Sequence, residues 1–145
     1  MLGGMKMNNR ILVIDGQGGQ LGSQIVKALL AKFSGISVTA VGTNAAATAA
    51  MMKAGAAKAA TGENPVIVAS RKADIIIGPI GIVIADSLMG EVTPAMAAAV
   101  GQADAVRILI PMNKCENIVA GVGDLSTSVL IQDAVAKAGR YLESR

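Results

Sequence analysis

The sequence contains no histidine, no tryptophan, a single cysteine and only two aromatic residues, Phe33 and Tyr141. The absence of histidine excludes Ser-His-Asp and Cys-His nucleophilic pairs and every imidazole ligand, and we expect no metal site. The lone Cys115 excludes an intramolecular disulfide. Because no histidine is present to activate its thiol, we do not expect Cys115 to be an essential nucleophile. No catalytic residue is assigned from the sequence.

Long hydrophobic runs and runs of one charge are also missing. The longest apolar stretch, residues 75–85, is too short to span a bilayer. The first ten residues lack the apolar core of a signal peptide, so we expect a cytoplasmic protein with no membrane partner. The basic residues are scattered and there is no aromatic platform, so nucleic-acid binding is not expected despite a net charge of +3.

Small and aliphatic residues are present in excess. Hydrophobic residues make up 52% of the 145 residues, and the mean hydropathy is +0.55. Many alanines in such a core allow helices to approach a sheet closely. The apolar surplus in a chain of single-domain length also predicts a buried subunit interface, and therefore a homodimer or larger homo-oligomer.

Segments of strand character and helix character alternate along the chain. Strands are expected at residues 11–15, 36–41, 56–60 (a weak edge strand), 75–78, 107–111 and 118–122. Helices are expected at residues 20–33, 45–54, 82–89, 95–100 and 127–138, with Thr93 and Ser126 as caps, and a further one beginning at Asn64-Pro65, although its β-branched residues disfavour a helix.

This alternation predicts the fold class. The strands are apolar on both faces, which is typical of a mostly parallel sheet covered by helices on both sides. We therefore expect one doubly wound α/β domain over residues 11–145, with strand order 3-2-1-4-5. Residues 1–10 are expected to be a flexible N-terminal segment.

The stretch ILVIDGQGGQLG, residues 11–22, carries the clearest motif. Gly16, Gly18 and Gly22 form G-x-G-x-x-x-G between a strand and a helix. The dinucleotide fingerprint G-x-G-x-x-G is one residue shorter, unless Gly19 takes a fingerprint role. Glycines here let a phosphate approach the backbone, and the helix N-terminus offers N–H donors. We expect this loop, including Gln17, to bind a nucleotide, NAD(P) or another phosphate-bearing small molecule; the alternative is a tight turn without a ligand.

Two features separate this stretch from an ordinary NAD site. The second strand should end in an acid that binds the ribose hydroxyls, but the sequence there reads Gly42, Thr43 and Asn44. Asn44 suits a ribose contact and a helix cap equally well. Asp15 directly precedes the loop and would repel a phosphate, so we expect its carboxylate to accept loop N–H groups instead.

A second glycine turn, GPIG, follows the fourth expected strand. The strand order places it opposite Gly16, at the switch point where open α/β sheets bind ligands; the alternative is that it only shapes a turn. Asp86 and Glu91 are the nearest acids, and Asp86 is expected on a helix surface. The further ligand contacts predicted here are Gly78, Pro79, Ile80, Gly81 and, after the fifth strand, Asn113.

Five phrases together resemble a family of short bacterial proteins known only as a domain of unknown function: VIDGQGGQLG, GTNAAATAAMMKAGA, ATGEN, ADIIIGPIGIVIADSLMGEVTPAMA and ILIPMNKC. The resemblance spans residues 11 to about 136, and residues 73–97 are its most specific part. It implies a Rossmann-like fold and no established substrate, so no catalytic residue carries over. Gln20, Asp86 and the longer N-terminus depart from the family pattern, which makes them poorer functional candidates than Asp15 and Gly16.

Three functions remain open on this basis. The first is a module that binds a nucleotide or another phosphate-bearing ligand. The second is a small NAD(P)-dependent enzyme whose site is shared between subunits, because a chain of this length has no separate substrate domain. The third is a structural or interaction protein without a ligand, which the missing acid at the end of the second strand keeps open.

Overall fold

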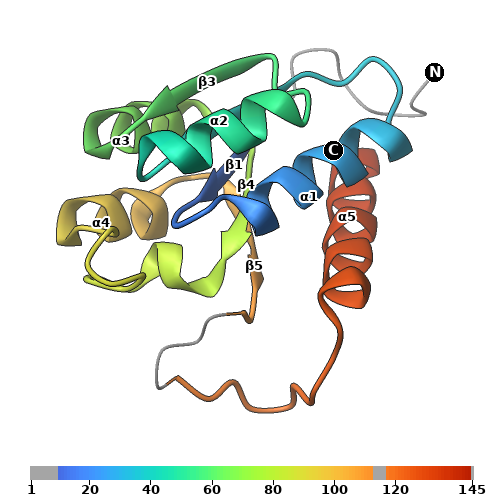
Figure 1. Cartoon of the computed structure of the whole chain (residues 1–145). Coiled ribbons are helices and arrows are strands. Elements are labelled where there is room, and N and C mark those ends of the chain that lie inside the picture. The colour runs from blue at the N-terminus through green and yellow to red at the C-terminus, as the bar shows by residue number, and fades with distance from the viewer. Residues whose placement is uncertain (1–9, 113–116, 145) are drawn as a thin grey trace.

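The computed structural model describes residues 10–112 and 117–144 and is built around a parallel sheet (Figure 1). The strands are β1 (Ile11–Asp15), β2 (Val38–Gly42), β3 (Lys58–Thr61), β4 (Ile75–Pro79) and β5 (Val106–Ile110). Their order in the sheet is β3-β2-β1-β4-β5, and all neighbours are parallel. The α/β class, the parallel sheet and the strand order expected from the sequence are therefore confirmed.

Helices cover both faces of this sheet. They are α1 (Gln20–Lys32), α2 (Ala45–Lys53), α3 (Glu63–Lys72), α4 (Pro94–Gln102), α5 (Thr127–Glu143) and the short 3-10 helix η1 (Ile80–Val83). α1 contacts α2 and α5 on one face, and α3 contacts α4 on the other (Figure 1). Alternate strand residues supply the two cores: Val13 and Ile77 are buried on the α1 face, and Leu12 and Ile76 on the α3 face.

Two expected elements are wrong. Residues 82–89 were expected to be helical, but the chain leaves η1 at Val83 and continues through turns in which Asp86, Leu88 and Met89 have left-handed backbone. Residues 118–122 were expected to be a strand, but they form an irregular connection. Ile118 there is 95% exposed, and residues 118–122 join none of the strands in the described part of the chain.

The helix starts are mostly as expected. Thr93 caps α4 by accepting the Met96 N–H at 3.1 Å, and Ser126 caps α5 by accepting the Val129 N–H at 3.2 Å. The α3 start is wrong by two residues, because Gly62 rather than Asn64 is its N-cap. The helix forms despite its β-branched residues because Val66 is buried in the core.

Within residues 10–112 and 117–144, no helix is both long and apolar enough to cross a membrane. The expected boundary between a ten-residue N-terminal segment and the domain stays a prediction, because residues 1–9 lie outside the described part of the chain.

Candidate functional site

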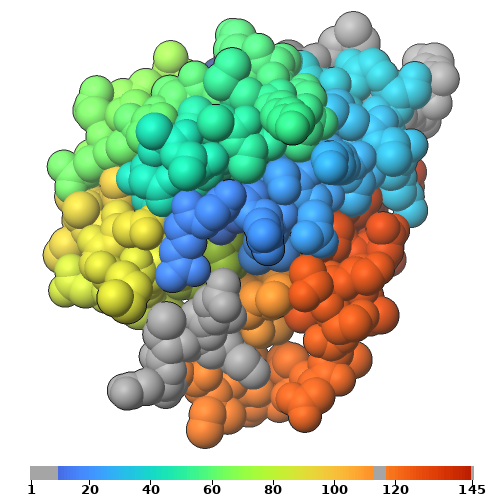
Figure 2. All heavy atoms as spheres, viewed as in Figure 1, coloured from blue at the N-terminus to red at the C-terminus, as the bar shows by residue number. Residues whose placement is uncertain are grey.

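The glycine loop leads from β1 directly into α1, as its motif predicts. Gly19 is the N-cap of α1 with φ 74°, and its N–H donates to the carbonyl of Gly16 at 2.9 Å. A Cβ on Gly19 would lie 2.7 Å from the Cα of Ala47. The left-handed backbone and the close approach of α2 both require glycine at position 19. In Figure 2 the loop, in blue, lies at the surface between α2 and the yellow segment that follows β4.

Gly22 lets α1 pack closely on β1. A Cβ there would lie 2.7 Å from Cβ of Asp15 and 2.6 Å from Sδ of Met51. This close packing is the part that the last glycine of the dinucleotide fingerprint plays. Although this loop is one residue longer than the fingerprint, Gly22 therefore takes the packing role of the last fingerprint glycine.

Substitution of Gly22 by alanine should destabilise the domain. We expect Gly22→Ala to lower the free energy of unfolding by about 1–3 kcal/mol, because the new methyl group overpacks the α1–β1 contact. Gly101→Ala is the matched control, since Gly101 lies in α4 with open space around it, and should stabilise by about 0.5–1 kcal/mol. Urea denaturation measures both values, and equal stability of the two variants would contradict the packing argument.

Gly18 differs from the other loop glycines. It is exposed, a Cβ on it would meet nothing within 4 Å, and its φ lies outside the left-handed range. Packing and backbone geometry therefore do not require glycine at position 18.

Asp15 accepts loop N–H groups, as expected. Its Oδ1 accepts from Gly16 N at 2.8 Å and its Oδ2 from Gly22 N at 2.6 Å. The side chain is 5% exposed. Burial raises the pKa of Asp15 above its ordinary value, and the nearby charge of Glu91 adds to the rise, while the two hydrogen bonds oppose it.

Glu91, which the sequence analysis names only as a nearby acid, lies at the centre of the site. Its Oε1 accepts three hydrogen bonds, from Gln17 N at 2.8 Å, from Thr43 Oγ1 at 2.7 Å and from Asn44 Nδ2 at 2.8 Å. Desolvation alone would raise the pKa of Glu91, but the three hydrogen bonds together lower it. Among the described residues, no donor is bonded to the second oxygen, Oε2.

Asn44 organises the end of β2. Its Oδ1 accepts the Ala47 N–H at 2.9 Å and so caps α2, as one of its two predicted roles requires. Its amide nitrogen donates to the Gln17 carbonyl at 2.9 Å as well as to Glu91. Because these bonds use both amide hydrogens and the oxygen caps a helix, the structure favours the capping interpretation over a ribose contact.

A tight segment, residues 84–92, carries Glu91 to this position. Leu88 and Val92 anchor the segment in the core at 2% and 1% exposure, whereas Met89 at its tip is 93% exposed. Asp86, Leu88 and Met89 all have φ between 54° and 65°. Left-handed backbone at non-glycine residues costs energy and is concentrated at functional sites. This segment therefore supports a functional role for the Glu91 carboxylate.

The model of one protein family matches residues 10–143 of the chain, and it describes a domain of unknown function, DUF3842. The chain belongs to this family. The match confirms that the chain belongs to a family of unknown function, as the sequence phrases indicate. No curated protein and no solved structure matches the chain.

The second glycine turn of this DUF3842 domain, residues 78–81, lies at the carboxyl end of the sheet, where β1 also ends. The register of β1 with β4 pairs Val13 with Ile77, which sets Gly78 against Ile14, and a side chain on Gly78 would collide with the Ile14 carbonyl. Pro79 ends β4, Ile80 begins η1, and a Cβ on Gly81 would lie 2.9 Å from Ser87 Oγ. The turn thus supports the 84–92 segment. Asn113, Lys114 and Cys115 lie outside the described residues.

The donors left in the loop define what the DUF3842 site offers a ligand. The N–H groups of Gly19, Gly22 and Ser23 donate within the chain, and that of Gln17 donates to Glu91. In the part of the chain that the structure describes, the N–H groups of Gly18, Gln20 and Leu21 have no protein acceptor. Three unsatisfied donors at a helix N-terminus suit an anion. Among these same residues no cluster of His, Cys, Asp and Glu is arranged to hold a metal ion.

Proposed function

We propose that this domain binds a nucleotide or dinucleotide, with a phosphate on the loop at residues 16–21 and the ribose against Glu91. The observation that carries the proposal is Gly18. The fold does not need a glycine there, yet the position lies beside the unpaired N–H groups of Gln20 and Leu21. A glycine without a structural reason at this point is what a phosphate in contact with the backbone requires.

Glu91 supports a ribose in this proposal. An ordinary dinucleotide site takes its ribose-binding acid from the end of the second strand, and Thr43 and Asn44 stand there instead. Both side chains donate to Oε1 of Glu91, so they bring a carboxylate from a distant loop to that place. The unbonded Oε2 is then the acceptor for a ribose hydroxyl. A ribose 2′-phosphate would meet the negative charge of Glu91, so the proposal favours NAD over NADP.

Calorimetry of the purified chain against NAD, NADP, ATP, AMP and inorganic phosphate tests the proposal. We expect NAD or AMP to bind in the micromolar range, because a few charge-assisted hydrogen bonds of about 1.5–3 kcal/mol each suffice after the entropic costs. If none of the five ligands binds, the loop serves only the turn and the domain has a structural or interaction role.

We also propose that the chain forms a homodimer or larger homo-oligomer through its 117–129 arm. The arm, in orange, consists of residues 117–126, which run outside the helices, and the first three residues of α5 (Figure 1). Ile118, Leu125 and Val129 in it are 95%, 55% and 52% exposed. Apolar side chains gathered on one projecting segment are typical of a surface that a second subunit covers.

Charge placed on the arm should therefore separate the subunits. We expect Ile118→Asp combined with Leu125→Asp to convert an oligomer into a monomer in light scattering. Met52→Asp is the control, because Met52 is 57% exposed on α2, away from the arm, and its variant should remain oligomeric. A wild-type chain that is a clean monomer at micromolar concentration would contradict this proposal.

A further inference from the structure

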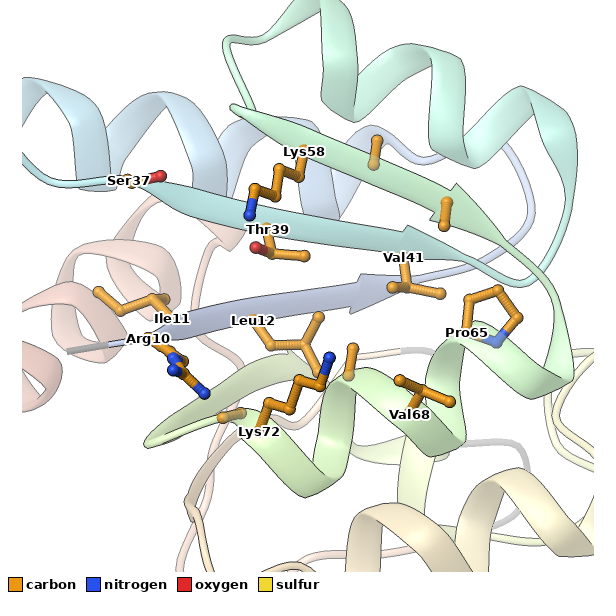
Figure 3. A pocket seen from close by; sticks show the side chains of 14 residues that line it. Arg10, Ile11, Leu12, Ser37, Thr39, Val41, Lys58, Pro65, Val68 and Lys72 are labelled. Carbon is orange, nitrogen blue, oxygen red and sulfur yellow. The ribbon is translucent and has the colours of Figure 1, made fainter. Parts of the chain in front are cut away.

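A groove of about 640 Å³ lies on the α3 face of the sheet (Figure 3). Its floor is formed by β1, β2 and β3, and α3 forms one wall. Its residues are separate from those of the glycine loop and from Glu91. The volume falls within the range of small-molecule sites in proteins, which is roughly 300–1,000 Å³.

One end of the groove is positively charged. Arg10, Lys58 and Lys72 line it, and Figure 3 shows their side chains reaching toward the groove from the residue before β1, from β3 and from α3. Among the residues that the structure describes, no carboxylate lines the groove and none lies within ion-pair distance of these three cations. Asp74, two residues after Lys72, accepts the backbone N–H of Arg10 at 2.7 Å. Within residues 10–112 and 117–144, the three cationic groups thus form no ion pair.

The other end of the groove is apolar. Val41, Pro65 and Val68 lie together there (Figure 3), at the end of β2 and on the first turns of α3. Leu12 lies on the floor between the two ends. The groove therefore changes from cationic to apolar along its length.

We propose that this groove binds a small amphiphilic anion, with a carboxylate or phosphate monoester head on an apolar body. The head lies among Arg10, Lys58 and Lys72, where a guanidinium can hold two oxygens at once. The body lies along Val41 and Val68. A groove-to-groove contact with a second copy does not suit this surface, because it would bury the three cations of each copy and no described carboxylate lines the groove to pair with them.

Calorimetry with decanoate, decyl phosphate and decylamine tests the charge and the apolar body together. We expect decanoate or decyl phosphate to bind with saturation, and decylamine, which has the same chain and the opposite charge, to bind at least about tenfold more weakly. The tighter of the two anions identifies the head group. Amide shifts in nuclear magnetic resonance should move at Val41 and Val68 when the anion is added.

Paired variants localise the head group. We expect Lys58→Gln with Lys72→Gln to weaken anion binding by at least about tenfold. Lys32→Gln with Lys53→Gln removes the same charge from exposed positions on α1 and α2 and should leave binding unchanged. Equal binding by the two double variants, or equal binding of decylamine and decanoate, would overturn the proposal. A third result would also overturn it: neither anion binds, the wild-type chain is a dimer, and Val68→Asp dissociates that dimer. The groove would then be a subunit interface.

Discussion

Gly18→Val is expected to abolish nucleotide binding while leaving the domain folded. The isopropyl group would stand where a phosphate must contact the N–H groups of the loop. Loss of two charge-assisted hydrogen bonds of about 1.5–3 kcal/mol each corresponds to a loss of more than about a hundredfold in affinity. The free energy of unfolding should change by no more than about 0.5 kcal/mol, because a side chain at position 18 meets open space.

The test of this expectation compares two exposed glycines. Gly101→Val is the matched control, since Gly101 in α4 is also exposed, also outside the left-handed range and also surrounded by open space. Calorimetry should show binding in wild type and Gly101→Val and none in Gly18→Val, with the free energies of unfolding of all three within about 0.5 kcal/mol. A Gly18→Val protein that binds NAD as tightly as wild type would show that no phosphate contacts the loop.

Glu91→Gln is expected to change ligand preference and stability together. The variant keeps an oxygen that can accept from Thr43 and Asn44 but loses the charge. We expect the preference for NAD over NADP to fall by at least about tenfold, because the 2′-phosphate no longer meets a carboxylate. The free energy of unfolding should fall by about 1–3 kcal/mol, because charge-assisted hydrogen bonds become neutral ones. An unchanged ratio of NAD to NADP affinity would place the ribose away from Glu91.

The pH dependence separates the charge from the shape of the side chain. The pKa of Glu91 is lowered from its ordinary value of 4.5, so its carboxylate stabilises the fold above that value and the contribution is lost as the pH falls through the lowered pKa. Asp15 acts in the opposite direction, because its raised pKa makes its charged form unfavourable in the folded state. Thermal melts should therefore show a stability difference between wild type and Glu91→Gln at neutral pH that shrinks well below pH 4.5.

The sheet was predictable from the sequence because its information is local. Runs such as ILVID and IIIGP are apolar on both faces, and their alternation with helices leaves few arrangements. The turn after β4 was not predictable, because Leu88 reaches the core through left-handed backbone that its residue type does not favour. The strand expected at residues 118–122 was wrong for the opposite reason: Ile118 is apolar, as a buried strand residue would be, but it is 95% exposed.

The candidate site likewise combines residues from one short stretch of sequence with one residue that is distant in the chain. Asp15 and the glycines were recognised because they lie within one short stretch whose spacing has a physical meaning. Glu91 was noted only as a nearby acid, since its part depends on a hydrogen bond to Gln17, which is 74 positions earlier in the chain. A single sequence carries no signal for that pairing. The absence of an acid at the end of β2 was a real feature, and only the folded chain shows which carboxylate stands there.

The strand order also determines when each edge of β1 can pair during synthesis of the chain. β1 is central, and its register joins Ile11 to Val38 on one side and to Ile75 on the other. During synthesis at about 5–20 residues per second, the second edge of β1 waits about 2–7 seconds longer than the first for its partner. For that time the apolar ILVID segment has an unpaired edge, which invites pairing with another nascent chain. The time for which this edge stays unpaired during synthesis therefore adds a risk of aggregation that the stability of the finished fold does not remove.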